Sequence, residues 1–276
     1  MTEGKIDDVA RNQLEKLFPP QAIKGNSRLS LAEAPSIYEV VRGLHEESYV
    51  PLGRAMPADM LDRIRQYVDA AGNDDVDVLT GNDGYIQYRQ EYIAKSSEIM
   101  NLASDPYLVS IAQQYFGVQP VLGYCHAWKI NPVKFTQEEY SYTAQMFHND
   151  KDGFHQLKIF LFLSDVPSGG EHYYVPGTHR VRLPQFWTIR RFTDEEVESA
   201  YGADRIRSIP FKAGHMVAAD TRALHKGSSP TSEPRIMLQF TYMTSLFSID
   251  TARCPSPPHP GLIALGPRFG ARYIVE

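Results

Sequence analysis

Hydrophobic residues in the first 117 positions recur every three to four residues, which is the spacing of one face of a helix. The clearest pattern predicts a helix over Ala58–Ala71, where Pro57 suits the first turn and Gly72 ends it. Similar spacing and end signals predict three more helices: Asp7–Leu17 before Pro19, Ser36–Glu47, and one that Asp105 caps and Gly117 closes. This part of the chain is expected to be mainly helical.

From Gln119 onward the hydrophobic residues gather in short runs separated by Gly, Pro, Asn and Ser. Residues 188–204, rich in Glu and Arg, predict one helix among these runs. Strands without regular helices between them indicate an antiparallel sandwich or barrel. The tail from Pro255, with turn-like Pro and Gly clusters, is expected to wrap over the surface. Six runs predict strands: Val121–Ile130, Leu157–Phe162, His172–Val175, Ile206–Phe211, His215–Ala219 and Ile236–Thr244.

A chain of 276 residues is long enough for one large β-rich domain with helical additions. Hydrophobic residues make up 42% of it and charged residues 22%, which is ordinary for a globular protein with a packed core. We therefore expect a single domain over residues 1–276. Within it, residues 1–117 form mainly helical support, 118–245 the β core and 246–276 the wrapping tail.

Charge and cysteine content exclude several classes of function. The net charge is -5 and the Lys and Arg residues are scattered, so neither nucleic acid nor a membrane surface is an expected partner. Met1 to Gln13 is polar and no later run is apolar enough for a membrane span, so a cytoplasmic protein is expected. Cys125 and Cys254 are too few for a disulfide framework or a Cys-rich metal site. Any metal must then be bound by His and carboxylates.

Two histidines are followed two positions later by a carboxylate, namely His45 with Glu47 and His148 with Asp150. In the helical stretch around His45, side chains at i and i+2 point in different directions, so this pair is expected on the solvated surface. His148 and Asp150 lie in a strand or turn context, where alternate side chains share a face and can converge on one ion. The alternative is an exposed hydrogen-bonded pair with no metal.

A third ligand must come from another strand, and six histidines follow Asp150: His155, His172, His179, His215, His225 and His259. His225 is favoured because Arg235, ten residues on, opens the apolar run Ile236–Thr244. An arginine that points into a barrel is costly unless it pairs with a carboxylate, for which guanidinium is a natural bidentate partner. His215 is a weaker candidate since no arginine stands ten residues after it, and His155 and His172 are expected to be hydrogen-bonded structural residues.

These motifs, from about Tyr49 to Tyr242, resemble the phytanoyl-CoA dioxygenase-like family of Fe(II)/2-oxoglutarate oxygenases. The family's His-X-Asp resembles His148-Asn149-Asp150, and its glycine-rich turn with a following Val-Pro-Gly-Ser-His resembles residues 169–179. Its distal His and Arg resemble His225 and Arg235, and its preceding helix and strand resemble residues 104–129. Two departures occur in the loop after His225: Pro230 stands where Asn is usual, and the loop is one residue shorter.

The resemblance implies a double-stranded β-helix, also called a jelly-roll or cupin-like fold, with His148, Asp150 and His225 as ligands of Fe(II). Two imidazoles and a carboxylate on one face leave positions open for 2-oxoglutarate and O2. The resemblance further implies that Arg235 binds the C5 carboxylate of 2-oxoglutarate, and that oxidation, most simply hydroxylation, of a small molecule releases succinate and CO2. Two alternatives stay open: a cupin-type metal enzyme that does not use 2-oxoglutarate, and a non-catalytic barrel that acts as a binding protein.

Candidates for contact with the substrate are less specific. Aromatic and polar side chains near the metal strands are expected to line a pocket, and residues 132–146 are polar enough to form a lid. Lys129 and Lys158 lie on predicted strands and either assist an anionic ligand or extend to the surface. The pocket candidates are Trp128, Tyr140, Tyr142, Gln145, Phe147, Phe154 and Tyr173.

Overall fold

The structure is a computed structural model that describes residues 13–151, 154–165, 169–187, 191–210, 212–246, 254, 257 and 259–273. Its strands are β1 (Tyr49–Gly53), β2 (Val76–Val78), β3 (Tyr85–Tyr88), β4 (Val121–Ile130), β5 (Gln156–Phe162), β6 (His172–Tyr174), β7 (Arg207–Ile209), β8 (Met216–Ala219), β9 (His225–Gly227) and β10 (Arg235–Met243). Its helices are α2 (Ile37–Glu47), α3 (Ala58–Asp69), α4 (Gln90–Ala94), α5 (Ser97–Ala103), α6 (Pro106–Phe116), α7 (Gln137–Tyr142), α8 (Asp194–Tyr201), α9 (Pro260–Ala264) and α10 (Gly266–Phe269). Short 3-10 turns cover Leu31–Glu33, Asn73–Asp75, Gly81–Asp83, Pro184–Phe186 and Ala203–Arg205.

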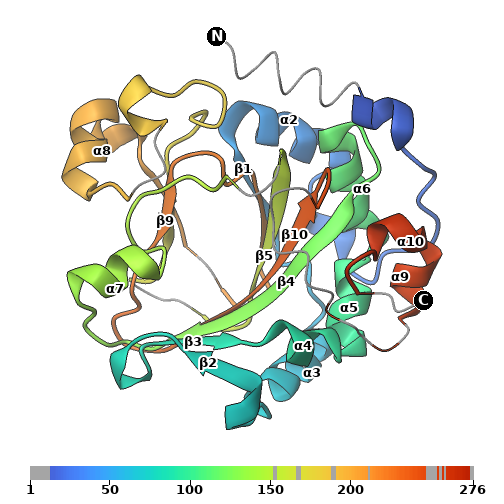
Figure 1. The fold of residues 1–276 in the computed structure, drawn as a ribbon, viewed down its shortest axis with the longest axis horizontal. Coiled ribbons are helices and arrows are strands. Elements are labelled where there is room, and N and C mark those ends of the chain that lie inside the picture. The colour runs from blue at the N-terminus through green and yellow to red at the C-terminus, as the bar shows by residue number, and fades with distance from the viewer. Residues whose placement is uncertain are drawn as a thin grey trace.

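A seven-stranded antiparallel sheet in the order β1-β8-β5-β10-β4-β3-β2 forms the larger layer. Its centre is the long pairing of β10 with both β4 and β5, in which Gln239 lies opposite His126 on one side and Phe160 on the other. A smaller antiparallel sheet, β7-β6-β9, forms the second layer. In Figure 1, β9, α7 and α8 lie on one side of the large sheet, and α5, α6, α9 and α10 lie on the other.

Alternation along the strands divides the large sheet into two faces. Leu157, Ile159 and Leu161 of β5 belong to the main hydrophobic core that the sheet forms with the helices. Phe160 and Phe162 belong to a second cluster, on the side of the small sheet. Lys158 stands between Leu157 and Ile159 and therefore points away from the helical layer, toward the space between the two sheets.

The helix ends follow the sequence signals. Ser36 and Glu39 form a capping box at the start of α2, Asp105 accepts a hydrogen bond from the backbone N–H of Tyr107 at the start of α6, and Gly117 ends α6 with a left-handed φ of 71°. Residues 13–17 are helical, whereas the rest of the predicted Asp7–Leu17 helix lies outside the described residues. All six predicted strands are present within a few residues of their expected ends, although Phe211 lies outside the described residues.

The main difference from the expected organisation is that β1, β2 and β3 come from the first 117 residues and occupy both edges of the large sheet. These strands have three to five residues, too short for a clear alternation, which is why the sequence did not reveal them. The single-domain boundaries stay a prediction. Among the described residues, no helix is long and apolar enough to cross a membrane, and both cysteines are buried and free of disulfides.

Candidate metal centre

The segment with His148 and Asp150 runs extended between β9 and the turn after β8. His148 and His225 form an antiparallel bridge in which each backbone N–H donates to the other's carbonyl at 2.9 Å. The backbone N–H of Asp150 donates to the carbonyl of Thr221 at 2.9 Å. His148 and Asp150, two positions apart on extended chain, therefore present their side chains to the same side, next to His225. The two side chains of the His-X-Asp motif thus face the same side, and their role as metal ligands stays a prediction.

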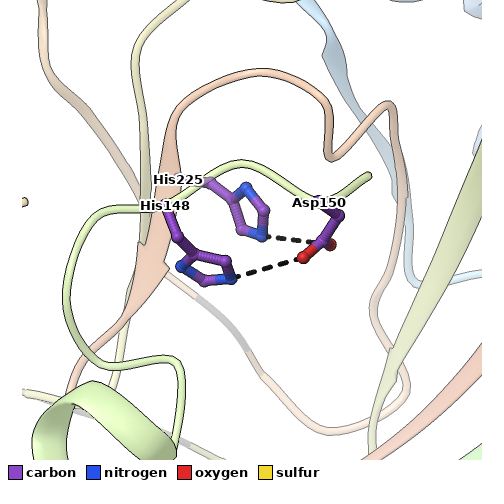
Figure 2. Close-up of side chains that lie close together, drawn as sticks. All are labelled: His148, Asp150 and His225. Carbon is purple, nitrogen blue, oxygen red and sulfur yellow. Dashed lines mark ion pairs between the residues drawn. The ribbon is translucent and has the colours of Figure 1, made fainter. Parts of the chain in front are cut away.

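The three side chains point toward one another (Figure 2). The Nε2 atom of His148 lies 3.6 Å from Oδ1 of Asp150, and Nε2 of His225 lies 3.6 Å from Oδ2 of the same carboxylate. All three donor atoms lie within 4.8 Å of one another. Donors bound at about 2.1 Å to one ion lie roughly 3–3.6 Å apart, so a first-row cation would need only a small contraction of this triangle.

Backbone carbonyls orient both imidazoles. The Nδ1 atom of His148 lies 2.9 Å from the Met146 carbonyl, and Nδ1 of His225 lies 2.9 Å from the Ala223 carbonyl. A carbonyl only accepts hydrogen bonds, so each Nδ1 carries the proton and each Nε2 presents a lone pair. This is the tautomer that metal-binding histidines use when a backbone group holds the other nitrogen.

The charges of the three groups also suit a cation. Burial lowers the pKa of His148 well below its ordinary value of 6.5, with a further contribution from His225, and burial likewise lowers the pKa of His225. Burial alone would raise the pKa of Asp150, but the Lys158 ammonium holds it well below its usual range. At neutral pH the site therefore offers two neutral imidazoles and one carboxylate, the protonation state in which these groups bind metals.

Lys158 of β5 donates a hydrogen bond from Nζ to Oδ2 of Asp150 at 2.7 Å. The lysine is 12% exposed and the carboxylate 17%, so solvent screens this ion pair only partly. The sequence did not separate a site lysine from a surface lysine here. The signal that could have done so is the alternation along β5, which places the polar Gln156 and Lys158 on the face away from the helices.

Arg235, at the start of β10, is 2% exposed and lies against the small sheet. Its Nη1 donates a hydrogen bond to the carbonyl of Gly170, and its buried Nε has no hydrogen-bond partner among the described residues. A Cβ on Gly227 would lie 3.0 Å from Nη2, so the missing side chain at Gly227 lets the guanidinium approach β9 two residues from His225. Burial lowers the pKa of Arg235 to about 10, opposed by Tyr85 and Glu171. A buried, partly unpaired guanidinium beside a metal centre suits an anionic ligand.

The substrate-contact candidates lie in different surroundings. Phe147 is buried in a cluster with Phe186 and Phe192, and Gln145 is buried and accepts a hydrogen bond from the Ser229 hydroxyl. The other candidates are at least partly exposed, and their contact with a substrate stays a prediction: Trp128 on β4, Tyr140 and Tyr142 on α7, Phe154 before β5, and Tyr173 on β6.

The remaining histidines do not join the triad. His215 hydrogen-bonds through Nδ1 to the Lys212 carbonyl before β8, whereas the triad lies near the turn that follows β8. His155 hydrogen-bonds to Arg222, and His172 packs edge-on against Phe160 at 4.9 Å. His45 is exposed on α2, as expected for its surface pair with Glu47.

Two further residues beside the site were not anticipated. The ring of Tyr49 on β1 lies 6.2 Å from that of His225, and its buried hydroxyl has no hydrogen-bond partner among the described residues. The charge of Arg191 contributes to the lowered pKa of His148, and its Nε donates to the carbonyl of Ser141 at 2.9 Å. No sequence signal distinguishes Arg191, whereas Tyr49 was missed together with its short strand.

A separate cavity of about 350 Å³ lies between residues 21–28, α5, α6 and the C-terminal helices. Gln21, Lys24, Val109 and Leu265 are among its lining residues, and none of the three candidate ligands is. This cavity is therefore not the metal site.

No protein-family model and no curated protein matches this sequence. Among solved structures, the non-heme, alpha-ketoglutarate-dependent carbocyclase SnoK of nogalamycin biosynthesis superposes with a TM-score of 0.61 at 18% identity, over 77% of this chain and 87% of its own. The epimerase SnoN of the same biosynthesis gives 0.59 at 16% identity, over 75% and 82%. EctD from S. alaskensis, solved with 2-oxoglutarate and 5-hydroxyectoine, gives 0.54 at 17% identity, over 82% and 86%. These similarities establish the fold, and the predicted jelly-roll, or double-stranded β-helix, is confirmed.

Proposed function

We propose that this protein is an Fe(II)- and 2-oxoglutarate-dependent oxygenase that oxidises a small-molecule metabolite. The observation that carries the proposal is the convergence of His148, Asp150 and His225, with both Nδ1 atoms tied to backbone carbonyls. Two imidazoles and one carboxylate form the donor set of non-haem Fe(II) oxygenases that bind co-substrate and O2 at the same ion. The fold is shared with proteins whose printed descriptions name alpha-ketoglutarate dependence.

Arg235 supports 2-oxoglutarate as the co-substrate. Its guanidinium is buried, approaches β9 next to the metal centre and retains an unpaired Nε among the described residues. The C5 carboxylate would complete its hydrogen bonds, while the other end of the molecule reaches the metal. The resemblance of the His225 and Arg235 spacing to the phytanoyl-CoA dioxygenase-like family supports the same assignment, and we propose membership of that family.

Bound Fe(II), with 2-oxoglutarate and O2, supplies the oxidising chemistry, in which decarboxylation to succinate and CO2 accompanies oxidation of a substrate C–H bond. The residues of the chain bind and orient the metal ligands and the co-substrate. The Met146 and Ala223 carbonyls hold the two imidazoles, and Lys158 holds one oxygen of Asp150. Arg235 would hold the far carboxylate of the co-substrate. Phe160 and Phe162, on the same face of β5 as Lys158, are buried in an apolar cluster between the two sheets.

Hydroxylation is the proposed outcome because it places the fewest geometric requirements on the pocket: the substrate carbon has only to lie close to the metal. Other outcomes occur within this fold, since SnoK is described as a carbocyclase and SnoN as an epimerase. SnoN and HygX have been solved with nogalamycin RO and hygromycin B, and by analogy we propose a small-molecule substrate here. The proposed substrate contacts are Trp128, Gln145, Phe147 and Tyr173, which are buried or partly buried, and Tyr142 and Phe154, which are exposed.

The test is succinate formation from 2-oxoglutarate by the Fe(II)-loaded protein across a panel of metabolites. A true substrate should raise succinate formation in proportion to its own oxidation. A cupin-type enzyme that does not use 2-oxoglutarate would instead consume O2 with substrate alone. A non-catalytic binding protein would do neither, and would bind a panel compound without oxidising it.

A further inference from the structure

The loop 220–224, between β8 and β9, positions two of the three candidate ligands through its backbone. The carbonyl of Thr221 accepts the backbone N–H of Asp150, and the carbonyl of Ala223 accepts Nδ1 of His225, both at 2.9 Å. If the loop moved by an ångström, the carboxylate and one imidazole would move with it. The conformation of this loop therefore controls the shape of the donor triangle.

A buried carboxylate closes the loop at its start, while Thr178 and Arg182 hydrogen-bond to the backbone of Leu224 and Arg222. Asp220 is fully buried, and its Oδ1 accepts the backbone N–H of Arg222 at 3.1 Å, the pattern of an Asx turn. Its backbone carbonyl accepts the N–H of Ala223 at 3.1 Å, and its own N–H donates to the carbonyl of Ser48 at 2.8 Å. The side chain and backbone of Asp220 thus close the turn and attach it to the residue before β1.

The same carboxylate is surrounded by side-chain donors. Arg222 donates from Nε to Oδ1 at 3.0 Å and from Nη2 to Oδ2 at 2.6 Å, and the Tyr115 hydroxyl of α6 donates to Oδ2 at 2.5 Å. Nη2 of Arg222 also contacts Nε2 of His155 at 2.7 Å. Because arginine only donates, His155 accepts through Nε2 and carries its proton on Nδ1. Every oxygen of the buried carboxylate is satisfied by groups from α6 or the loop itself.

Such a network is not explained by stability alone. Replacing a buried ion pair with apolar residues of similar volume is often neutral or stabilising, so a buried Asp–Arg pair is weak evidence for a contribution to folding. What the pair does here is select one conformation of a short turn whose next carbonyls contact Asp150 and His225. Groups that orient ligands from outside the coordination sphere typically change metal affinity by about 10–100-fold when they are replaced.

We infer that Asp220, with Arg222 and Tyr115, is a positioning residue of the metal centre: it fixes the loop 220–224 so that Asp150 and His225 are preorganised for the ion. The inference rests on the metal site of the proposed function, and it assigns no contact between Asp220 and the metal or substrate. It predicts that metal affinity depends on a carboxylate that the metal does not touch.

The experiment titrates Co(II), an air-stable probe for the Fe(II) site, into wild-type protein and into Asp220→Asn, with the ligand-field absorption of bound Co(II) as the readout. The variant is expected to bind Co(II) about 10–100-fold more weakly and to give shifted absorption bands, because the ligand geometry changes. The matched control is Asp105→Asn, which alters another buried carboxylate at the opposite end of α6 from Tyr115, without contact to the loop. The thermal midpoint of each variant is measured beside its Co(II) affinity.

Wild-type Co(II) affinity and spectrum in Asp220→Asn would overturn the inference, whatever its thermal midpoint. Equal losses of affinity in Asp220→Asn and Asp105→Asn would also overturn it, since the effect would then reflect general destabilisation. If Asp220→Asn does not fold, Tyr115→Phe takes its place, with an expected loss of about threefold because the other donors to the carboxylate remain; an unchanged affinity there would count against the inference. Failure of wild-type protein to bind Co(II) would instead reject the metal site of the proposed function.

Discussion

Replacing Arg235 with methionine should separate the role of this residue in binding from its role in folding. Burial lowers the pKa of Arg235 to about 10, and this shift corresponds to about 3 kcal/mol against the charged guanidinium, at about 1.36 kcal/mol per pH unit. The side chain is 2% exposed, so solvent screening does not reduce this figure much. A carboxylate ligand would offset this cost of burying the charge, whereas a methionine in place of Arg235 would remove the cost.

The free energy of unfolding of ligand-free Arg235→Met should therefore be equal to or higher than that of wild type, because a buried charge is replaced by an apolar side chain. Affinity for 2-oxoglutarate should fall about 30-fold or more, since truncating one partner of a buried charge pair costs about 2–5 kcal/mol. Arg235→Lys should recover only part of the affinity, because an ammonium group cannot form the bidentate pair. Binding of the metal alone should be unchanged.

The assay is calorimetric titration of 2-oxoglutarate into Fe(II)-loaded protein without O2, together with thermal melting of the metal-free protein. Arg268→Met is the matched control: burial also lowers the pKa of Arg268 to about 10, but this arginine donates to the carbonyls of Gln119 and Thr244 near the C-terminal helices. It should leave 2-oxoglutarate binding unchanged. If Arg235→Met binds 2-oxoglutarate within about threefold of wild type, another cation anchors the co-substrate, and Lys129 and Lys158 are the next to test.

Three other predictions follow from the same geometry. His148→Ala, Asp150→Ala and His225→Ala should each lose most Fe(II) affinity with near-unchanged circular dichroism, and a variant that keeps wild-type affinity and turnover would show that its residue is not a ligand. Burial keeps His148 and His225 neutral in the folded state, whereas in the unfolded chain both imidazoles take up protons below about pH 6.5. The free energy of unfolding of the metal-free protein, measured by urea titration, should therefore fall as the pH drops below about 6.5. A free energy of unfolding that stays level or rises would contradict this prediction. A halide could bind the metal only if the carboxylate of Asp150 left its coordination position, so the enzyme should not halogenate its substrate. Mass spectrometry of product formed in chloride-rich buffer under 18O2 should show one added 18O atom, the result of hydroxylation. A chlorinated product would reject Asp150 as a ligand.

The candidate ligands could be predicted from sequence because their signals are local or depend on chain topology. His148 and Asp150 are two positions apart on extended chain, and such side chains share a face wherever the segment lies. His225 was selected by the arginine ten residues later, and the structure places that arginine against β9, close to His225. The long strands β4 and β10 were predictable because nine or ten residues give a clear pattern.

The groups that surround the ligands were not predictable in the same way. Lys158 contacts Asp150 only because the extended segment that carries Asp150 lies beside β5. Asp220 contacts Tyr115, a residue far away in the sequence, only because α6 packs beside the loop 220–224. Tyr49 joins the site only because β1 pairs with β8, and a five-residue strand with no clear alternation does not indicate its partner. These contacts depend on which segments become neighbours in the folded chain, and the local sequence pattern does not indicate those neighbours.

We propose above that His148, Asp150 and His225 bind Fe(II) and that 2-oxoglutarate then chelates the same ion. The measurement that tests this chelation is the visible absorption spectrum of the protein in the absence of O2, because chelation of Fe(II) by a 2-oxo acid produces a charge-transfer band that neither component gives alone. This band should form in wild-type protein when both Fe(II) and 2-oxoglutarate are present. It should be lost in His225→Ala and should require a much higher 2-oxoglutarate concentration in Arg235→Met. Wild-type protein that binds Fe(II) but gives no band at saturating 2-oxoglutarate would show that 2-oxoglutarate does not chelate this ion. A band that persists unchanged in His225→Ala would show that His225 is not a ligand.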